Sequence, residues 1–418
     1  MTGREPATVV TVPGPEPRND VVVSYLAALD ADETAARAAA EGFALGQSLG
    51  TWKPVPGITD EMRRLHGARV VDLRRTSGDE VAGGVATDGR WLLSVAFPVS
   101  NLGASLAMLL TTAIGNDPST SIAMRVVGLD VPARFLDAFP GPRFGVDGWR
   151  ALTGVPDRPL LLNMIKPCTG FPPDVGAGFA AESARGGVDL IKDDELMADP
   201  SFSRVAARTR AYAAAIDAVA RATGRATRYV AHVTTTPGRL TATARAAVDA
   251  GAGAVMVTPL TLGLDALAEL AEAAGVPILA HVAGIEMWTG ATEGGIAHGA
   301  VVRLLRLAGA DAVLTSTPHA PRPLPSAAYE ATVAGLRDPI AGGGVRAAMP
   351  MPGGGITAEH VEPIVAALGL DVIVAVGGAI QGHPDGAAAG GRAIQQAIAD
   401  ATHRYRAGTM PPRIEAAS

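Results

Sequence analysis

The sequence predicts a (β/α)8 (TIM) barrel preceded by a small α+β domain. Eight apolar runs of strand length alternate with Ala-rich segments, and each run is almost continuously apolar, as expected for parallel strands covered on both faces. Eight such units in about 240 residues match the usual size of this barrel. A doubly wound sheet is the alternative, but the regular spacing and the polar residues at the strand ends favour the barrel. The runs are 160–165, 188–191, 229–233, 254–257, 277–280, 312–314, 347–351 and 372–376.

The segment before the barrel predicts a separate small domain. Residues 1–18 are rich in Pro and Gly and are expected to form a flexible lead-in. Residues 19–150 predict a ferredoxin-like α+β domain, with strands at 21–23, 69–73 and 91–96 and helices at 32–47, capped by Asp32, and 102–114. The barrel is expected over 151–400. An Ala-rich helix after Gly386 should lead into a polar tail at 401–418.

Composition excludes several classes of function. The net charge is −6 and the charged residues form no basic cluster, which argues against nucleic acid as a partner. Cys168 is the only cysteine, so an intrachain disulfide is impossible and a reducing cytoplasm is expected. The sequence has neither an apolar signal core nor a run of about 20 apolar residues, so no association with a membrane is expected.

An unusual cluster of charge follows the second apolar run, at Lys192 to Glu195. Three consecutive carboxylates resist ionisation together unless a cation lies among them, and Mg²⁺ prefers such oxygen ligands. The alternative is that the acidic triplet only solvates the start of a loop. The chain has three lysines, Lys53, Lys166 and Lys192, against 32 arginines (35 − 3). Arginine cannot become a base, a nucleophile or a carbamate, so the retained lysines indicate lysine chemistry.

These residues carry a family resemblance. The segment Gly186 to Glu195, together with Ile165-Lys166-Pro167, resembles the active-site segments of the large subunit of ribulose-bisphosphate carboxylase (RuBisCO), and the likeness extends from about Gln47 to Gly390. The resemblance implies that Lys192 captures CO₂ as a carbamate. Carbamylated Lys192 would then bind one Mg²⁺ per site with Asp194 and Glu195.

Further residues are assigned by the same resemblance. Lys166 matches the family's catalytic lysine, and burial beside a divalent cation should lower its pKa toward general acid/base range. The alternative is a lysine that extends over the barrel rim. His281 matches an active-site histidine, although a lone histidine at a strand end is often a core group. His232 stands where the family has an asparagine near the metal, and its role stays open.

Two glycine-rich stretches follow the last two apolar runs. Freed backbone amides at this end of a barrel can bind phosphate, whereas ordinary tight turns are the alternative. The resemblance assigns both stretches, with Thr51 and Trp52, to one phosphate site, and it assigns Asn116 to the metal site. Because these small-domain residues enter the neighbouring chain's barrel in the family, a homodimer is implied as the smallest catalytic unit. The glycines are Gly353, Gly354, Gly355, Gly377 and Gly378.

Departures from the carboxylase pattern change the expected reaction. Family residues that bind the second phosphate or contact the gaseous substrate are replaced or absent. The loop 315–326 has no lysine, only Arg322, and the family's catalytic glutamate is missing near Gly46. A bisphosphate substrate and CO₂ fixation are therefore not expected, which is the pattern of the RuBisCO-like proteins (form IV type). The other replaced positions are Cys168, Val282, Leu314 and Gly353.

The residues that are retained, namely the metal ligands, Lys166 and one phosphate site, predict that an enediolate forms from a singly phosphorylated keto sugar or sugar acid. A Mg²⁺-dependent lyase that decarboxylates, or cleaves an acyl group from, a phosphorylated 3-oxo sugar acid is the first hypothesis. An enolase or isomerase of methionine salvage, acting on a methylthio-pentose phosphate, is the second. It is expected to need a lysine near Asn116, and the chain has none there. A non-catalytic sugar-phosphate-binding dimer is the third. A class II aldolase is weaker, because the eight histidines do not cluster at metal-ligand spacing.

Overall fold

The computed structural model describes residues 20–50, 55–116, 118, 121–139, 141–291, 294–317, 323–341 and 343–410. The chain forms two compact units. Unit 1 comprises residues 1–140, 284–307 and 327–345, and unit 2 comprises residues 141–283, 308–326 and 346–418. Two segments from the second half of the chain thus belong with the N-terminal part. The linear domain limits at 150 and 400 therefore stay a prediction, and the lead-in 1–18 lies outside the described residues.

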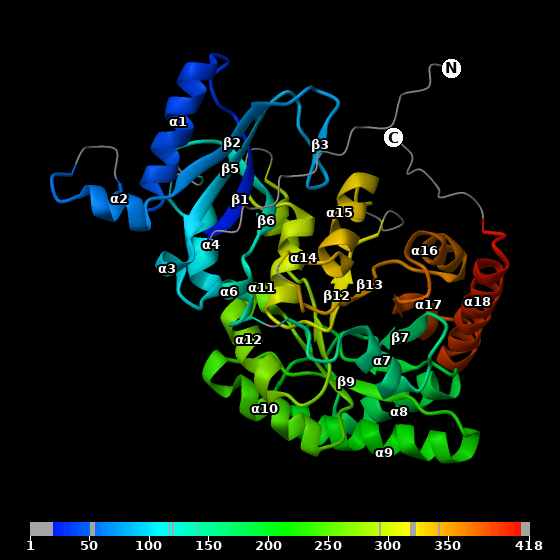
Figure 1. Cartoon of the computed structure of the whole chain (residues 1–418). Helices are drawn as coiled ribbons and strands as arrows, with labels where there is room; N and C mark the ends of the chain where they lie inside the picture. The colour runs from blue at the N-terminus through cyan, green and yellow to red at the C-terminus, as the bar shows by residue number, and fades with distance from the viewer. Residues whose placement is uncertain are drawn as a thin grey trace. The chain divides into compact units, whose positions relative to one another are not determined.

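Unit 2 contains an eight-stranded parallel sheet with strands in sequential order, which confirms the barrel and excludes the doubly wound alternative (Figure 1). The order is β13-β12-β11-β10-β9-β8-β7-β14, and an isolated bridge between Gly353 and Ala375 connects the two ends. The strands are β7 (Leu160–Met164), β8 (Leu190–Lys192), β9 (Arg228–His232), β10 (Ala254–Val257), β11 (Ile278–Ala280), β12 (Ala312–Thr315), β13 (Met349–Pro352) and β14 (Ile373–Val376).

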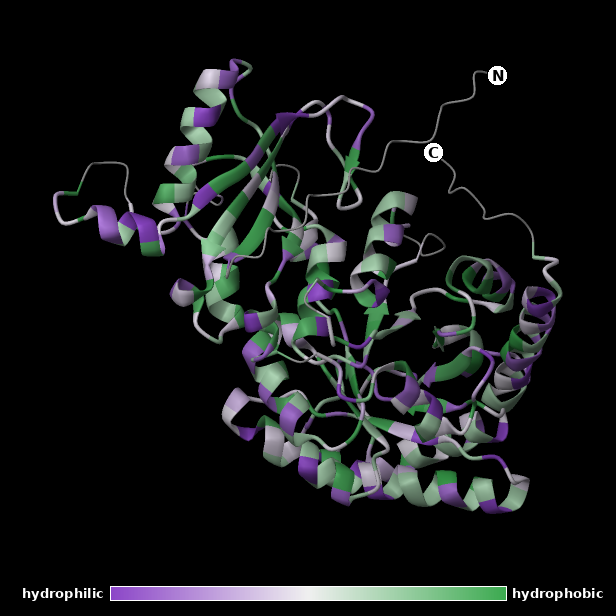
Figure 2. Cartoon of the chain, viewed as in Figure 1, coloured by the Kyte–Doolittle hydropathy of each residue, from purple (hydrophilic) through white to green (hydrophobic). Residues whose placement is uncertain are grey.

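The helices of unit 2 alternate with these strands, and the neighbours α8 and α9 pack side by side (Figure 1). The last helix alternates hydrophobic and hydrophilic residues along its length (Figure 2). It continues to Ala407, so the predicted tail at 401–418 begins too early. The helices are α7 (Gly145–Thr153), α8 (Pro173–Arg185), α9 (Val205–Thr223), α10 (Pro237–Asp249), α11 (Pro259–Leu262), α12 (Leu264–Ala273), η1 (Ala358–His360), α16 (Val361–Leu368), α17 (Gly378–Gln381) and α18 (Ala387–Ala407).

The core of unit 2 fills the barrel with apolar side chains from all eight strands, together with the fully buried Trp149 of α7. Asp311 fixes the entry into that helix. Its Oδ1 accepts hydrogen bonds from the backbone amides of Phe144 and Gly145, both at 2.7 Å, and its Oδ2 accepts one from Ile278 at 2.8 Å. A buried carboxylate thereby satisfies backbone donors on two different segments.

Unit 1 contains a four-stranded antiparallel sheet in the order β2-β5-β1-β6 and a small hairpin, β3 with β4. This order, with the β-α-β-β-α-β succession of the main elements, is the ferredoxin-like arrangement that the sequence predicted. The strands are β1 (Asp20–Ala27), β2 (Arg69–Arg75), β3 (Val81–Ala82), β4 (Val85–Ala86), β5 (Trp91–Pro98) and β6 (Met124–Asp130).

The helices of unit 1 include three that follow barrel strands in the sequence, α13, α14 and α15, and α14 packs against β6. Asp32 caps α1 as predicted and accepts the Ala35 amide at 2.9 Å. The single helix predicted at 102–114 is wrong, because Gly103 at φ 61° and the N-cap Ser105 divide it. The helices are α1 (Glu33–Gly46), α2 (Asp60–His66), α3 (Val99–Leu102), α4 (Leu106–Ile114), α6 (Ala133–Leu136), α13 (Ile285–Thr289), α14 (His298–Leu307) and α15 (Ser326–Arg337).

His298, the first residue of α14, is expected to make the stability of the protein depend on pH. Burial lowers its pKa from 6.5 against the opposing pull of Glu286. A depressed histidine pKa contributes stability that is present above about pH 6.5 and is lost as the pH falls through the folded-state pKa. We expect His298→Gln to flatten the dependence of the melting temperature on pH below 6.5. An unchanged slope in this variant would contradict the assignment.

No helix among the described residues is long and apolar enough to cross a membrane.

Candidate active site

Lys192 is the last residue of β8, and its side chain is completely buried. Its Nζ donates a hydrogen bond to the carbonyl of Asp193 at 2.8 Å. Burial lowers the pKa of Lys192 to about 8, against the opposing attraction of Glu195 and Asp194. The amine is therefore far easier to deprotonate than an ordinary lysine.

Lys166 lies just beyond the end of β7 and is partly exposed. Its Nζ is 2.5 Å from Oδ2 of the buried Asp194 and donates to Sγ of Cys168 at 3.2 Å. Burial lowers the pKa of Lys166, but the hydrogen bonds with Asp194 and Cys168 outweigh it, so the pKa is raised. The sequence predicted a lowered pKa for Lys166 beside a cation, and it did not reveal the ion pair with Asp194. Without a cation, this ion pair raises the pKa.

Two further predicted residues meet beside this pair. Nε2 of His281, one residue beyond β11, is 3.3 Å from Oε2 of Glu195. Burial lowers the pKa of His281 to about 3, so the ring is neutral. Its buried Nδ1 has no hydrogen-bond partner among the described residues.

His232, at the end of β9, has a similar character. Its Nε2 is 2.8 Å from Oγ1 of Thr234, and burial lowers the pKa of the ring to about 3. Its Nδ1 is buried and also has no partner within the described part of the chain. Both histidines thus have a neutral ring with a buried nitrogen that lacks a partner among the described residues, at the ends of β9 and β11, the two strands that flank β10.

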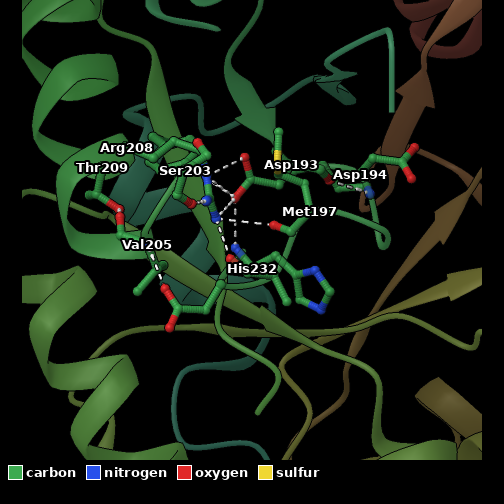
Figure 3. Close-up of polar contacts among 12 residues, drawn as sticks. Asp193, Asp194, Met197, Ser203, Val205, Arg208, Thr209 and His232 are labelled. Atoms are coloured by element: carbon green, nitrogen blue, oxygen red, sulfur yellow. Dashed lines mark hydrogen bonds and ion pairs between the residues drawn. The ribbon is translucent and has the colours of Figure 1, made fainter. Parts of the chain in front are cut away.

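Asp193, the first carboxylate of the triplet, takes a different direction from its neighbours. Its oxygens accept hydrogen bonds from the side chains of Arg208 and Tyr229 and from the backbone amide of His232 (Figure 3). Asp193 and Asp194 are both 2% exposed, so the alternative of a solvated loop start is wrong for these two residues. The sequence did not identify Arg208 and Tyr229.

The glycine-rich stretches follow β13 and β14, as predicted. Gly353 donates its amide to the Thr315 carbonyl at 3.1 Å, and Gly354 and Gly355 have φ values of 95° and 73° that favour glycine. A Cβ on Gly377 would lie 3.4 Å from Cε of Lys166, whereas a Cβ on Gly354 or Gly378 would meet nothing within 4 Å. The Gly377 stretch therefore lies close to Lys166 and leaves its backbone accessible.

The predicted residues of the small domain belong to unit 1 by their place in the sequence. Thr51 and Trp52 fall outside the described residues. Asn116 is exposed and follows α4 in unit 1. Their assignment to phosphate and metal sites stays a prediction.

The side chains at the end of β8 fit a hard divalent cation once one further oxygen ligand is supplied. Asp194 and Glu195 offer carboxylate oxygens, and both act electrostatically on the buried amine of Lys192. Among the described residues, no group of three His, Cys, Asp and Glu side chains is arranged to hold a metal. Two carboxylates alone do not complete such a site, and a carbamate on Lys192 would add the missing oxygens.

Comparison with known proteins agrees with this arrangement. The family model of the ribulose bisphosphate carboxylase large chain, catalytic domain, matches residues 145–322 and 328–410. A ribulose bisphosphate carboxylase-like protein of Archaeoglobus fulgidus is 40% identical over 367 residues, which are 87% of this chain and 83% of that protein. A 2,3-diketo-5-methylthiopentyl-1-phosphate enolase of Geobacillus kaustophilus is 36% identical over 375 residues, 88% of this chain and 89% of the relative.

Comparison with solved structures finds proteins of the same family. The crystal structure of a rubisco-like protein (MtnW) from Alicyclobacillus acidocaldarius superimposes with a TM-score of 0.82 at 35% identity, covering 92% of this chain and 94% of that one. The match of the family model extends over more than half of the chain and includes the whole cluster described above. The chain belongs to the RuBisCO large-chain family and is a RuBisCO-like protein.

Proposed function

We propose that the protein is a Mg²⁺-dependent lyase that cleaves a carbon–carbon bond of a singly phosphorylated 3-oxo sugar acid, with decarboxylation as the simplest case. The choice of a lyase over an enolase rests on the positions of the lysines in the sequence. Lys53 is the only lysine before Lys166, so the segment around Asn116 in the sequence contains no lysine that could remove a carbon-bound proton. Loss of CO₂ generates an enediolate without such a base.

The metal ligands in this proposal are Asp194, Glu195 and a carbamate formed from CO₂ on Lys192. Carbamate formation requires the neutral amine, and the buried position of Lys192 favours that form. Bound Mg²⁺ would supply Lewis-acid stabilisation of the negative charge that develops on a carbonyl oxygen. The backbone amides of Gly354, Gly355, Gly377 and Gly378 would hold the single phosphate, completed by Thr51 and Trp52, while the amide of Gly353 stays bound to the Thr315 carbonyl.

The bond changes in decarboxylation balance with one proton, which Lys166 delivers and solvent water then restores to it. The bond between the carboxylate carbon and its neighbour breaks, CO₂ leaves, and the electron pair moves onto the adjacent carbonyl group. Lys166 then delivers a proton to the carbon that lost CO₂, since its amine is protonated beside Asp194. The neutral His281 would hydrogen-bond a substrate oxygen, and Asn116 would be contributed by the second chain of a homodimer.

A second candidate is the enolase reaction on a 2,3-diketo-5-methylthiopentyl 1-phosphate. Its support is the name and the similarity of the Geobacillus kaustophilus relative. The same metal site and phosphate cradle would serve, but the proton would have to leave carbon without a lysine from the segment around Asn116.

Product analysis separates the two reactions. Purified protein with Mg²⁺ and bicarbonate would be incubated with phosphorylated 3-oxo sugar acids and, separately, with the diketo phosphate. We expect one CO₂ released for each sugar acid consumed and no conversion of the diketo phosphate. Consumption of the diketo phosphate alone would overturn the lyase assignment in favour of the enolase.

Lys166→Met tests the proton donor. This variant should lose turnover by a factor on the order of 10², as expected when a positioned acid is removed. Mg²⁺ affinity measured by calorimetry should stay within a few-fold of the wild type, because Lys166 is not a ligand. Lys166→Arg is the matched control, since it restores the charge beside Asp194 without a comparable proton donor. Full turnover in Lys166→Met would exclude the role.

A further inference from the structure

Asp193 lies between two metal-site residues, yet its carboxylate contacts neither of them. Arg208 donates Nε to Oδ1 at 3.1 Å and Nη2 to Oδ2 at 3.0 Å. The hydroxyl of Tyr229 donates to Oδ2 at 2.5 Å, and the amide of His232 donates to the same oxygen at 3.0 Å. Burial raises the pKa of Tyr229 well above its ordinary value, so its hydroxyl is a donor. All the donors come from α9 and β9 (Figure 3).

The guanidinium of Arg208 also binds backbone carbonyls of the loop that follows the metal-site residues. It is completely buried, and it donates to the carbonyls of Met197 at 3.1 Å, of Ala198 at 2.7 Å and of Ser203. One side chain therefore binds the beginning of this segment, at Asp193, and its end, at Ser203. The segment cannot turn about its own axis without breaking several charge-assisted hydrogen bonds.

The direction of Asp193 determines the direction of its neighbours. Successive side chains of an extended segment point to opposite sides. Asp193 directly follows β8 and is held toward α9, whereas the next carboxylate, Asp194, contacts Lys166 beyond the end of β7. The amide of Leu196 donates to Oδ1 of Asp194 at 3.2 Å and fixes that carboxylate from the following turn.

We propose that Asp193, held by Arg208 and Tyr229, is the positioning residue of the metal site and sets the orientation in which Lys192 and Asp194 receive Mg²⁺. The inference rests on the metal site of the proposed function and is independent of the substrate. A purely structural ion pair would affect only the stability of the fold. A positioning residue also affects the affinity for Mg²⁺ and the yield of carbamate.

Two neighbouring tyrosines provide a matched pair of variants. The rings of Tyr212 and Tyr229 are 5.0 Å apart, and both are buried. The hydroxyl of Tyr212 has no hydrogen-bond partner among the described residues, whereas that of Tyr229 contacts Asp193. Tyr229→Phe and Tyr212→Phe therefore remove the same atom from adjoining core positions, but only the first removes a contact to Asp193.

The experiment measures Mg²⁺ affinity by calorimetry at saturating bicarbonate, with the melting temperature of each variant. Tyr229→Phe should weaken Mg²⁺ binding about tenfold, at the lower end of the range for residues that orient metal ligands, and should reduce the ¹³C signal of the carbamate. Tyr212→Phe should bind as the wild type does. Equal affinities in the two variants would overturn the inference while the proposed function stands. Absence of Mg²⁺ binding by the wild type would overturn both.

Discussion

Replacing Lys192 with alanine is expected to abolish Mg²⁺-dependent turnover. The variant keeps Asp194 and Glu195 but loses the only group in the cluster that could supply further oxygen ligands as a carbamate. Losing several kcal/mol of metal-derived stabilisation corresponds to a decrease in rate on the order of 10³- to 10⁴-fold. Steady-state rates of CO₂ release with the best phosphorylated 3-oxo sugar acid, measured with Mg²⁺ and bicarbonate, would show the loss.

Lys192→Arg is the informative control for this variant. Arginine preserves the positive charge and most of the volume at the end of β8, but its guanidinium is not deprotonated and cannot form a carbamate. Activity should be as low as in Lys192→Ala. If Lys192→Arg kept most of the wild-type rate, Lys192 would be a source of charge and not a ligand.

Replacing Arg208 with methionine is expected to destabilise the fold strongly. Arg208 and Asp193 form an ion pair at 3.0 Å with both side chains almost completely buried. Removing the cation leaves a buried carboxylate with only neutral hydrogen-bond donors, and breaking such a pair from one side costs about 3–5 kcal/mol of unfolding free energy. The loss should appear as a clearly lower melting temperature and a lower denaturant midpoint.

The matched double variant, Arg208→Met with Asp193→Asn, separates charge burial from packing. Asparagine removes the unpaired charge while retaining a similar shape, so the double variant should regain part of the stability lost by Arg208→Met alone. If the stability lost by the double variant equalled the sum of the losses of the two single variants, the two residues would not interact energetically. That result would contradict the contact geometry.

The barrel and the location of the site could be predicted because both depend on local patterns. The eight apolar runs correspond to the eight strands within a few residues at each end. The second strand begins later than predicted, at Leu190, because the side chain of Asp189 accepts the Leu161 amide at 2.8 Å and pairs with Arg158 at 2.7 Å. Such a contact between distant segments cannot be recognised from the apolar run in the sequence.

The direction of each carboxylate in the acidic triplet could not be predicted from the triplet alone. Asp193 points toward α9 because it pairs with Arg208 on that helix. The chain has 32 arginines (35 − 3), so the sequence does not single out Arg208 as this partner. A signal for it does exist. Arg208 shares the buried face of α9 with Val205, Tyr212 and Ile216 at helical spacing, and an arginine on an apolar face needs a buried partner.

The ion pair of Lys166 was missed for a related reason, whereas the lowering of its pKa beside a bound cation stays a prediction. Burial was foreseen, and burial does act to lower the pKa. The distance of 2.5 Å between its Nζ and Asp194 depends on how the ends of β7 and β8 lie together, and that alignment is a property of the folded barrel.

The central claim is that Lys192 completes the metal site as a carbamate. Its most direct test is a ¹³C NMR spectrum of the protein in ¹³C-bicarbonate, recorded with and without Mg²⁺ for the wild type and for Lys192→Arg. We expect a carbamate resonance in the wild type that strengthens with Mg²⁺ and is absent from the variant. A wild-type spectrum without that resonance at saturating Mg²⁺, or the same resonance in Lys192→Arg, would contradict the claim.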